Sequence, residues 1–173
     1  MRSLHTISSS EALSRLQNIC SGQEKCSSDI RTRLRQWKIS PEDQEKILNR
    51  LIKDGFVDDR RFTGFFVRDK QRLNKWGKEK IRFALQRKEL SREIIDEALL
   101  LIPDENFEET LRELLRRKSA ETTKYNPYEL KNKLIRFAVQ RGFQYDLIFR
   151  VVDEFISSEG SDENTEKDEL DFS

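Results

Sequence analysis

The apolar residues of this chain recur at a period near fifty positions, and no other feature restricts the fold as strongly. Five positions of the first unit match the second at a constant offset of 51: Ile30, Leu34, Ile39, Ser40 and Leu48 correspond to Ile81, Leu85, Leu90, Ser91 and Leu99. Five positions of the second unit match the third at an offset of 53: Ile81, Leu85, Leu90, Ile95 and Leu99 correspond to Leu134, Ala138, Phe143, Ile148 and Val152. A unit of this length is too small to bury its own apolar face, so neighbouring units must stack. The repeat therefore predicts an all-α fold, a tandem array of three three-helix repeats that forms an elongated curved rod.

Within each unit the apolar spacing follows a helix rather than a strand. Nine helices are expected, and no alternating run bounded by hairpin signals occurs. Three helix starts carry a capping side chain, and two of these are followed by proline at the first helical position: Ser40–Pro41, Ser91 and Asn126–Pro127. Hydrophobic residues make up 35% of the chain and charged residues 38%, a balance that suits thin helical packing better than one deep core.

The helices divide the chain into five segments. Residues 1–10 are expected to form a flexible leader, and residues 159–173 an acidic, disordered tail with almost no apolar content. Between them we predict three-helix repeats at 11–53, 54–102 and 103–158. For an array of this kind we expect a monomer.

A net charge of only +1 hides strong charge blocks along the chain. Residues 60–92 hold twelve basic and three acidic side chains, whereas residues 93–113 hold eight acids and one arginine. The tail 159–173 holds seven acids and one lysine. Such blocks bear on partners rather than on fold, and the basic block suits a polyanion or an acidic protein surface. The alternative is a solvated helix face.

The composition excludes several functional classes. Cys20 and Cys26 are the only cysteines and their spacing matches neither a zinc site nor a disulfide framework, while His5 is the only histidine. We therefore expect no metal, no cofactor, no catalytic constellation and no enzymatic activity. No apolar run is long enough to span a membrane, and the N-terminus lacks the apolar core of a secretory signal. The cytoplasm is the expected location.

Several short motifs in the middle of the chain occur together. They are the run D-G-F-V-D-D-R-R-F at 54–62, Phe66-Val67-Arg68, the run K-W-G-K-E-K-I at 75–81, and Leu85 with Leu90. In this combination the chain resembles the RecX family, bacterial regulators of the RecA recombinase. It departs from the family pattern at one turn, where Glu89 stands in place of glycine, and we expect this change to leave the fold intact.

The resemblance implies a function and a partner. A RecX-like chain is expected to be a negative regulator of RecA that lies in the groove of the RecA–DNA filament. It would inhibit ATP hydrolysis, recombinase activity and strand exchange, and so modulate DNA repair and recombination, including the SOS response. The sequence leaves open whether inhibition blocks ATP turnover, disassembles the filament or occludes the second DNA.

Nine residues are the candidates for contact with the RecA filament or DNA. On a helical wheel of 58–76, Arg68, Arg72 and Lys75 return to the side of Arg61, which makes a basic stripe beside an apolar seam. Lys78 and Arg82 follow at the start of the next helix, and a smaller basic cluster lies in the third repeat. The full set is Arg61, Arg68, Arg72, Lys75, Trp76, Lys78, Arg82, Arg116 and Arg117.

Each candidate also has a structural interpretation. Trp76 is either a packing residue or an anchor for a partner, and Arg61 either caps the turn at Asp58 or contacts a partner. Arg116 and Arg117 alternatively pair with acids one helical turn earlier. The seam is expected to hold Phe62, Phe66, Leu73 and Trp76, with Asp69 among them as an ion-pair partner. The competing function is a non-specific DNA-binding helical module that competes for DNA, and a scaffold without any link to DNA is a third possibility.

Overall fold

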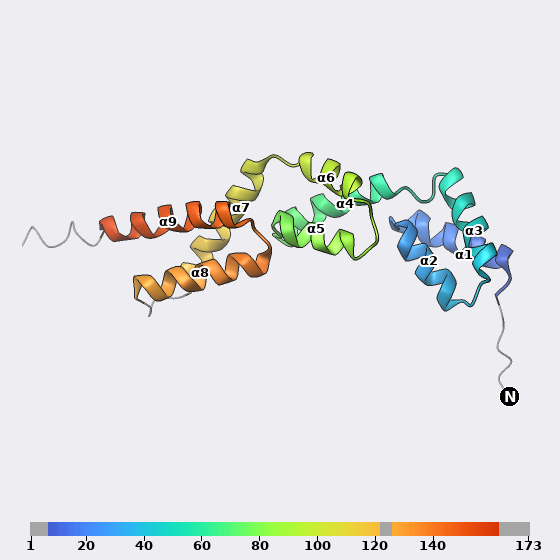
Figure 1. Cartoon of the computed structure of the whole chain (residues 1–173), viewed down its shortest axis with the longest axis horizontal. Helices are drawn as coiled ribbons and strands as arrows, with labels where there is room; N and C mark the ends of the chain where they lie inside the picture. Colours follow the sequence, from blue (N-terminus) through green and yellow to red (C-terminus); the bar gives the residue numbers. More distant parts are fainter. Residues whose placement is uncertain (1–6, 122–125, 163–173) are drawn as a thin grey trace, which may run out of the picture. The chain divides into compact units, whose positions relative to one another are not determined.

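The chain is all-helical throughout the part described by its computed structural model, which comprises residues 7–121 and 126–162, with side chains as far as Ser157. Those residues form nine α-helices and no strand, which confirms the predicted fold class (Figure 1). The helices are α1 (Ser9–Gly22), α2 (Ser27–Gln36), α3 (Pro41–Lys53), α4 (Asp59–Arg72), α5 (Lys78–Gln86), α6 (Arg92–Leu100), α7 (Asp104–Ala120), α8 (Pro127–Arg141) and α9 (Tyr145–Asp162). None of these helices combines the length and the apolar character needed to cross a membrane.

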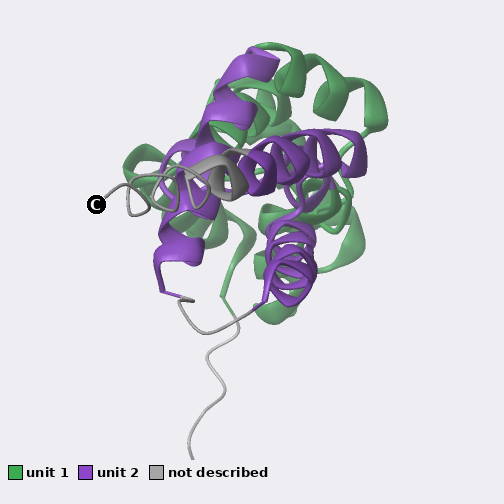
Figure 2. Cartoon of the chain, turned by 90° about the vertical axis from the view of Figure 1, so that its left-hand side faces the viewer, with its two compact units in different colours: residues 1–68, 83–101 green, residues 69–82, 102–173 purple. Residues whose placement is uncertain are grey.

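The helices gather into two compact units, coloured separately in Figure 2. The first unit comprises residues 1–68 and 83–101, and the second comprises residues 69–82 and 102–173. The division falls within α4 and α5, so the turn between these two helices belongs with the third helix triplet. The repeat boundaries and the curved-rod shape inferred from the sequence stay predictions.

The first unit holds the core that the apolar spacing predicts. Ala12 and Leu16 of α1 pack with residues of α2, α3 and the following turn, and nearly all are less than 8% exposed. The buried members are Ala12, Leu16, Ile30, Leu34, Ile39, Ile47, Leu48, Leu51 and Val57. Ile52 is 47% exposed, because it follows the buried Leu51 on the outer side of α3.

The three predicted caps are present. The Ser40 hydroxyl accepts a hydrogen bond from the amide of Asp43 at the start of α3. The Ser91 hydroxyl does the same for Ile94 in α6, and the Asn126 side chain accepts from the amide of the third residue of α8. These bonds satisfy amides that have no partner within the helix.

The second helix of each triplet ends in the same left-handed turn. Lys38, Glu89 and Gly142 have φ of 58°, 57° and 79°. In each case the next amide donates to a carbonyl five residues earlier: Ile39 to Leu34 at 3.1 Å, Leu90 to Leu85 at 3.5 Å and Phe143 to Ala138 at 3.2 Å. This is the hydrogen bond of a Schellman helix end. The departure at Glu89 therefore leaves the fold intact, as expected, and the turn is of the same kind as the one at Gly142, although only glycine adopts this conformation without steric cost.

Two predictions about α4 were wrong. Leu73 is 70% exposed and Asp69 is also exposed, although both were assigned to the apolar seam. The buried side of the helix instead runs through Phe62, Thr63 and Val67, together with Gly64. Because Thr63 and Gly64 belong to this buried side, it lies at a different angle from the one that hydrophobicity alone indicates.

The helices at both ends are longer than expected. The first begins at Ser9 rather than at residue 11, with Ser8 as its cap, and α9 runs to Asp162, past the predicted start of the tail at 159. His5, Tyr125 and residues 163–173 lie outside the described part of the chain, and so does most of the predicted leader.

Candidate partner-binding surface

The candidate residues are distributed over both units. Arg61 and Arg68 belong to the first unit, and the other seven belong to the second. Arg68 is exposed, and its guanidinium lies over the ring of the half-exposed Phe65 at 5.5 Å. A cation in this position keeps its charge in solvent while its stem covers apolar surface.

Arg61 is engaged within the first unit. Its Nε donates to Oε1 of Glu24 at 2.7 Å, and its Nη2 donates to the carbonyl of Gly55 at 3.1 Å. The α4 amides at Arg60 and Arg61 are capped by the carboxylate of Asp58, not by a guanidinium. The hydrogen bond to Glu24 raises the pKa of Arg61. Arg61 therefore links the α1–α2 connection to the turn before α4, which favours its structural interpretation.

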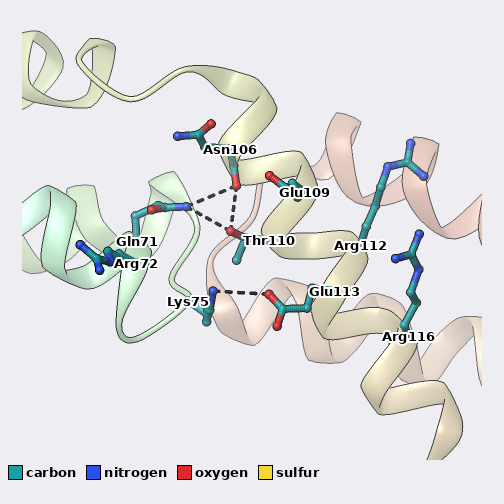
Figure 3. Close-up of a pocket in the computed structure, with 9 residues that line it drawn as sticks. All are labelled: Gln71, Arg72, Lys75, Asn106, Glu109, Thr110, Arg112, Glu113 and Arg116. Carbon is teal, nitrogen blue, oxygen red and sulfur yellow. Dashed lines mark hydrogen bonds and ion pairs between the residues drawn. The ribbon is translucent and has the colours of Figure 1, made fainter.

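A groove of about 600 Å³ opens in the second unit between the end of α4 and the first half of α7 (Figure 3). Its lining residues are Gln71, Arg72, Lys75, Asn106, Glu109, Thr110, Arg112, Glu113 and Arg116. The Gln71 amide bridges the two sides, donating to Oγ1 of Thr110 at 3.0 Å and to the carbonyl of Asn106 at 3.3 Å. The groove thus gathers three of the nine candidate residues, Arg72, Lys75 and Arg116.

The cations of this groove differ in their partners. Arg112 donates to Glu108 at 2.8 Å and to Glu154 at 2.5 Å, so its charge is balanced within the unit. Hydrogen bonding from Arg112 also holds the pKa of the Glu108 carboxyl below its usual range. By contrast, Arg72 and Arg116 are exposed and form no ion pair among the described residues. These two guanidinium groups are the ones available to an acidic partner.

Glu113 forms ion pairs with two of the predicted site residues. Its Oε2 lies 3.4 Å from Nζ of Lys75, and its Oε1 accepts from Arg117 at 2.5 Å. The pair with Arg117 is the i,i+4 contact of the alternative interpretation. All three side chains keep at least a third of their surface exposed, so the attraction between them is weak and exchangeable.

Trp76 lies in the turn between α4 and α5, and its ring is half-buried. Nζ of Lys70 lies 5.1 Å and Nζ of Lys80 4.9 Å from the ring centroid, so both ammonium groups contact the aromatic face. The Trp76 amide donates to the carbonyl of Lys70 at 3.0 Å. This arrangement favours a packing role that orders the basic turn.

The same turn is bonded to the end of α8 through two glycines. The Gly77 amide donates to the carbonyl of Arg141 at 2.8 Å, and the Glu79 amide donates to the carbonyl of Gly142 at 3.0 Å. The Arg141 guanidinium returns a bond to the carbonyl of Asn74 at 3.1 Å. Gly77 belongs to one of the sequence motifs, but no local sign in the sequence indicates that it contacts Gly142.

Lys78 and Arg82 are less available than predicted. The Lys78 ammonium pairs with Asp104 and lies 5.2 Å from the ring centroid of Phe107, and the side chain is 17% exposed. Arg82 is half-buried on α5. Lys78 therefore joins the start of α5 to the start of α7, and it does not contribute to an open basic surface.

Among the described residues no group of three or more His, Cys, Asp or Glu side chains is arranged to hold a metal ion. Burial raises the pKa of both the Cys20 and the Cys26 thiols, which keeps them protonated and unreactive. Exposed arginines beside an ordered basic turn, on tandem helix triplets, define an all-helical protein with a candidate binding surface.

Comparison with known families shows to which family this helical chain belongs. Residues 58–99 match the second three-helix domain of RecX, and residues 104–152 match the third three-helix domain of RecX. The two matches together cover more than half of the chain. The chain belongs to the RecX family of regulatory proteins, which agrees with the resemblance seen in its motifs and with the expectation of a regulator rather than an enzyme.

Individual relatives carry the same name. A protein of Clostridium botulinum called Regulatory protein RecX is 33% identical over 137 residues, which are 78% of this chain and 64% of that protein. Its counterpart in Lactobacillus johnsonii is 28% identical over 161 residues, 93% of this chain and 58% of the relative. The chain thus spans slightly less than two thirds of these relatives. The crystal structure of RecX from Lactobacillus salivarius has the same fold, with a TM-score of 0.77 and 23% identity over 84% of this chain and 95% of that one.

Proposed function

We propose that the chain is a negative regulator of RecA that binds in the groove of the RecA–DNA filament. There it inhibits ATP hydrolysis, recombinase activity and strand exchange, and thereby modulates DNA repair and recombination. Membership of the RecX family supports this function. The observation that carries the mode of binding is the pair of exposed guanidinium groups of Arg72 and Arg116 at one groove, which form no ion pair with any residue that the structure describes.

The positive charge of the groove and the presence of two units on one chain explain how the protein would act. The groove residues meet acidic side chains of the filament or the DNA within it, where arginine forms bidentate bonds with carboxylate or phosphate. Two units on one chain can engage neighbouring filament subunits, so that weak contacts at each combine through high effective concentration. Inhibition follows if subunits are fixed relative to one another or if the path of the second DNA is blocked.

The second candidate function is direct, non-specific binding to DNA. The excess of basic residues in 60–92 favours it, because each neutralised phosphate releases counterions. This function predicts that the chain acts by competing for DNA and needs no contact with RecA.

ATP hydrolysis by preformed RecA filaments at a fixed DNA concentration separates the two functions. A regulator lowers turnover when the chain is substoichiometric to RecA and most DNA is still covered by RecA. A competitor for DNA lowers turnover only when the chain is sufficient to saturate the DNA, and added DNA then restores hydrolysis. Unchanged turnover at every concentration would contradict both functions and favour a scaffold without a link to DNA.

A further inference from the structure

The same unit has a second groove, whose lining shares no residue with the first. It has a volume of about 670 Å³ and is formed by the C-terminal turn of α7 and one face of α8. Its lining residues are Lys118, Tyr128, Glu129, Asn132, Lys133, Arg136, Phe137 and Gln140. None of them belongs to the nine candidate residues.

This groove combines aromatic surface with positive charge. Tyr128 is 76% exposed, and the ring of Phe137 has Nζ of Lys118 at 5.8 Å and the guanidinium carbon of Arg141 at 5.3 Å from its centroid. Three of the lining side chains are cations and only Glu129 is an acid. The chemistry suits an acidic segment that also carries apolar side chains, because carboxylates meet the cations while apolar groups cover the rings.

We propose that this groove is the docking site for the acidic segment 163–173 of the same chain. That segment has five carboxylates against one lysine, and it ends in the run D-E-L-D-F-S. Leu170 and Phe172 alternate with acids there, so in an extended conformation they point to one side. The two apolar side chains contact the rings of Tyr128 and Phe137, and the carboxylates face the cations of α7 and α8.

The geometry of the unit brings the segment within reach. α8 and α9 pack side by side in opposite directions, so the end of α9 lies beside the start of α8 (Figure 1). An ion pair of 2.7 Å between Lys131 and Asp153 fixes their register. The ten residues from Asp162 to Phe172 span up to about 33 Å when extended, whereas a helix with its side chains is about 10–12 Å across. The segment is therefore long enough to pass around α8 and lie in the groove.

Docking has a regulatory consequence that goes beyond the proposed function. The segment masks cations of the second unit and adds negative charge to its surface, which disfavours any acidic or polyanionic partner. Releasing the segment would expose the groove without a change in fold.

Paramagnetic broadening in NMR spectra tests the docking directly. A nitroxide is attached to the variant Ser173→Cys in a chain that also carries Cys20→Ser. Cys26 remains unlabelled because its side chain is completely buried. At low salt we expect loss of amide signal intensity at Asn132, Lys133 and Arg136, with no loss in α2 and α3 of the first unit.

Two variants and two solution conditions distinguish the segment 163–173 from other possible explanations of the broadening. Neutralising the segment with Glu166→Gln, Asp168→Asn, Glu169→Gln and Asp171→Asn should restore the intensities, as should high salt. Replacing Lys133 and Arg136 by Gln should do the same, whereas Arg35→Gln with Lys46→Gln on the first unit should not. Full intensity in α8 at low salt overturns the proposal. Broadening centred on Arg72 and Arg116 overturns it in favour of the other groove, and broadening that disappears on dilution overturns it in favour of a second copy of the chain.

Discussion

The backbones of Gly77 and Gly142 are in close contact, and neither position has room for a side chain. A Cβ on Gly77 would overlap the carbonyl oxygen of Gly142, and a Cβ on Gly142 would overlap the backbone and Cβ of Lys80. Backbone hydrogen bonds on both sides hold the contact, from Gly77 to Arg141 and from Glu79 to Gly142. The turn between α4 and α5 is therefore positioned by the end of α8, and both glycines are needed for it.

We predict that Gly142→Ala destabilises the protein by about 2 kcal/mol or more, because it combines left-handed strain with steric overlap. Gly77→Ala should also be destabilising, through overlap alone. The matched control is Gly22→Ala in α1, which has open space around it and should be neutral or stabilising by about 0.5 kcal/mol. Urea titrations followed by circular dichroism measure these differences, and equal effects of Gly142→Ala and Gly22→Ala would contradict the close approach.

The left-handed Glu89 offers a gain in stability. Replacing it with glycine removes the steric cost of φ 57° and should raise the free energy of unfolding by about 0.5–1 kcal/mol. Glu93→Gly, at an exposed position of α6 with right-handed backbone, should instead lower it by about 1 kcal/mol. In the same thermal or urea experiment, a higher free energy of unfolding for Glu89→Gly and a lower one for Glu93→Gly support the left-handed conformation at Glu89. A lower free energy of unfolding for both variants would argue against it.

Asp29 should make stability depend on pH. Burial alone would raise the pKa of its carboxyl, but hydrogen bonds from Lys88, at 2.7 Å, and from Cys26 hold the pKa below its usual range. A carboxyl with a lowered pKa in the folded state contributes stability above its unfolded pKa of about 3.9 and loses it as the pH falls through the folded value. Asp29→Asn should therefore cost about 1 kcal/mol at pH 7 and progressively less below pH 4.

The control for this prediction is Glu45→Gln, which removes a more exposed pair with Arg31 and should change stability little at any pH. Urea midpoints measured from pH 2 to pH 7 provide the comparison. A constant difference between Asp29→Asn and the parent over this range would mean that the carboxylate charge is not the cause.

Loss of three of the candidate cations should weaken inhibition of the RecA filament. The variant Arg68→Gln, Arg72→Gln, Lys75→Asn removes these charges, and asparagine tolerates the left-handed backbone at position 75. If each charge contributes about 0.5 kcal/mol, the concentration for half-inhibition of ATP hydrolysis rises about tenfold.

The charge-matched control Arg35→Gln, Lys46→Gln, Arg50→Gln lies on α2 and α3 and should inhibit as the parent does. Both triple variants should unfold at temperatures near that of the parent, since the replaced side chains are at least one third exposed. Equal inhibition by the two variants would exclude the three candidate cations as the contact surface.

Features set by local sequence were predictable from it. The caps at Ser40, Ser91 and Asn126 involve an amide three residues away, and the core positions of α2 and α3 follow one helical period. These signals lie within a single turn or helix, so no knowledge of tertiary packing is needed to interpret them.

Features that depend on distant residues were not predictable. Lys78 was assigned to an open basic surface, but its partner Asp104 is 26 positions away. Similarly, the buried side of α4 includes Thr63 and Gly64, which a wheel drawn from hydrophobicity does not weigh. The contact of Gly77 with Gly142 joins two turns from different triplets, and neither turn carries a local sign of it.

The shared turn after α2, α5 and α8 shows that one backbone shape is built from three unlike side chains. A search pattern that requires glycine at this point would find only the third of the three turns and would miss the other two. Lysine and glutamate persist there because the surrounding hydrogen bonds and packing define the bend. Alignments of related chains are therefore better anchored on the hydrogen-bonded pairs, Leu34 with Ile39 and Leu85 with Leu90, than on the residue between them.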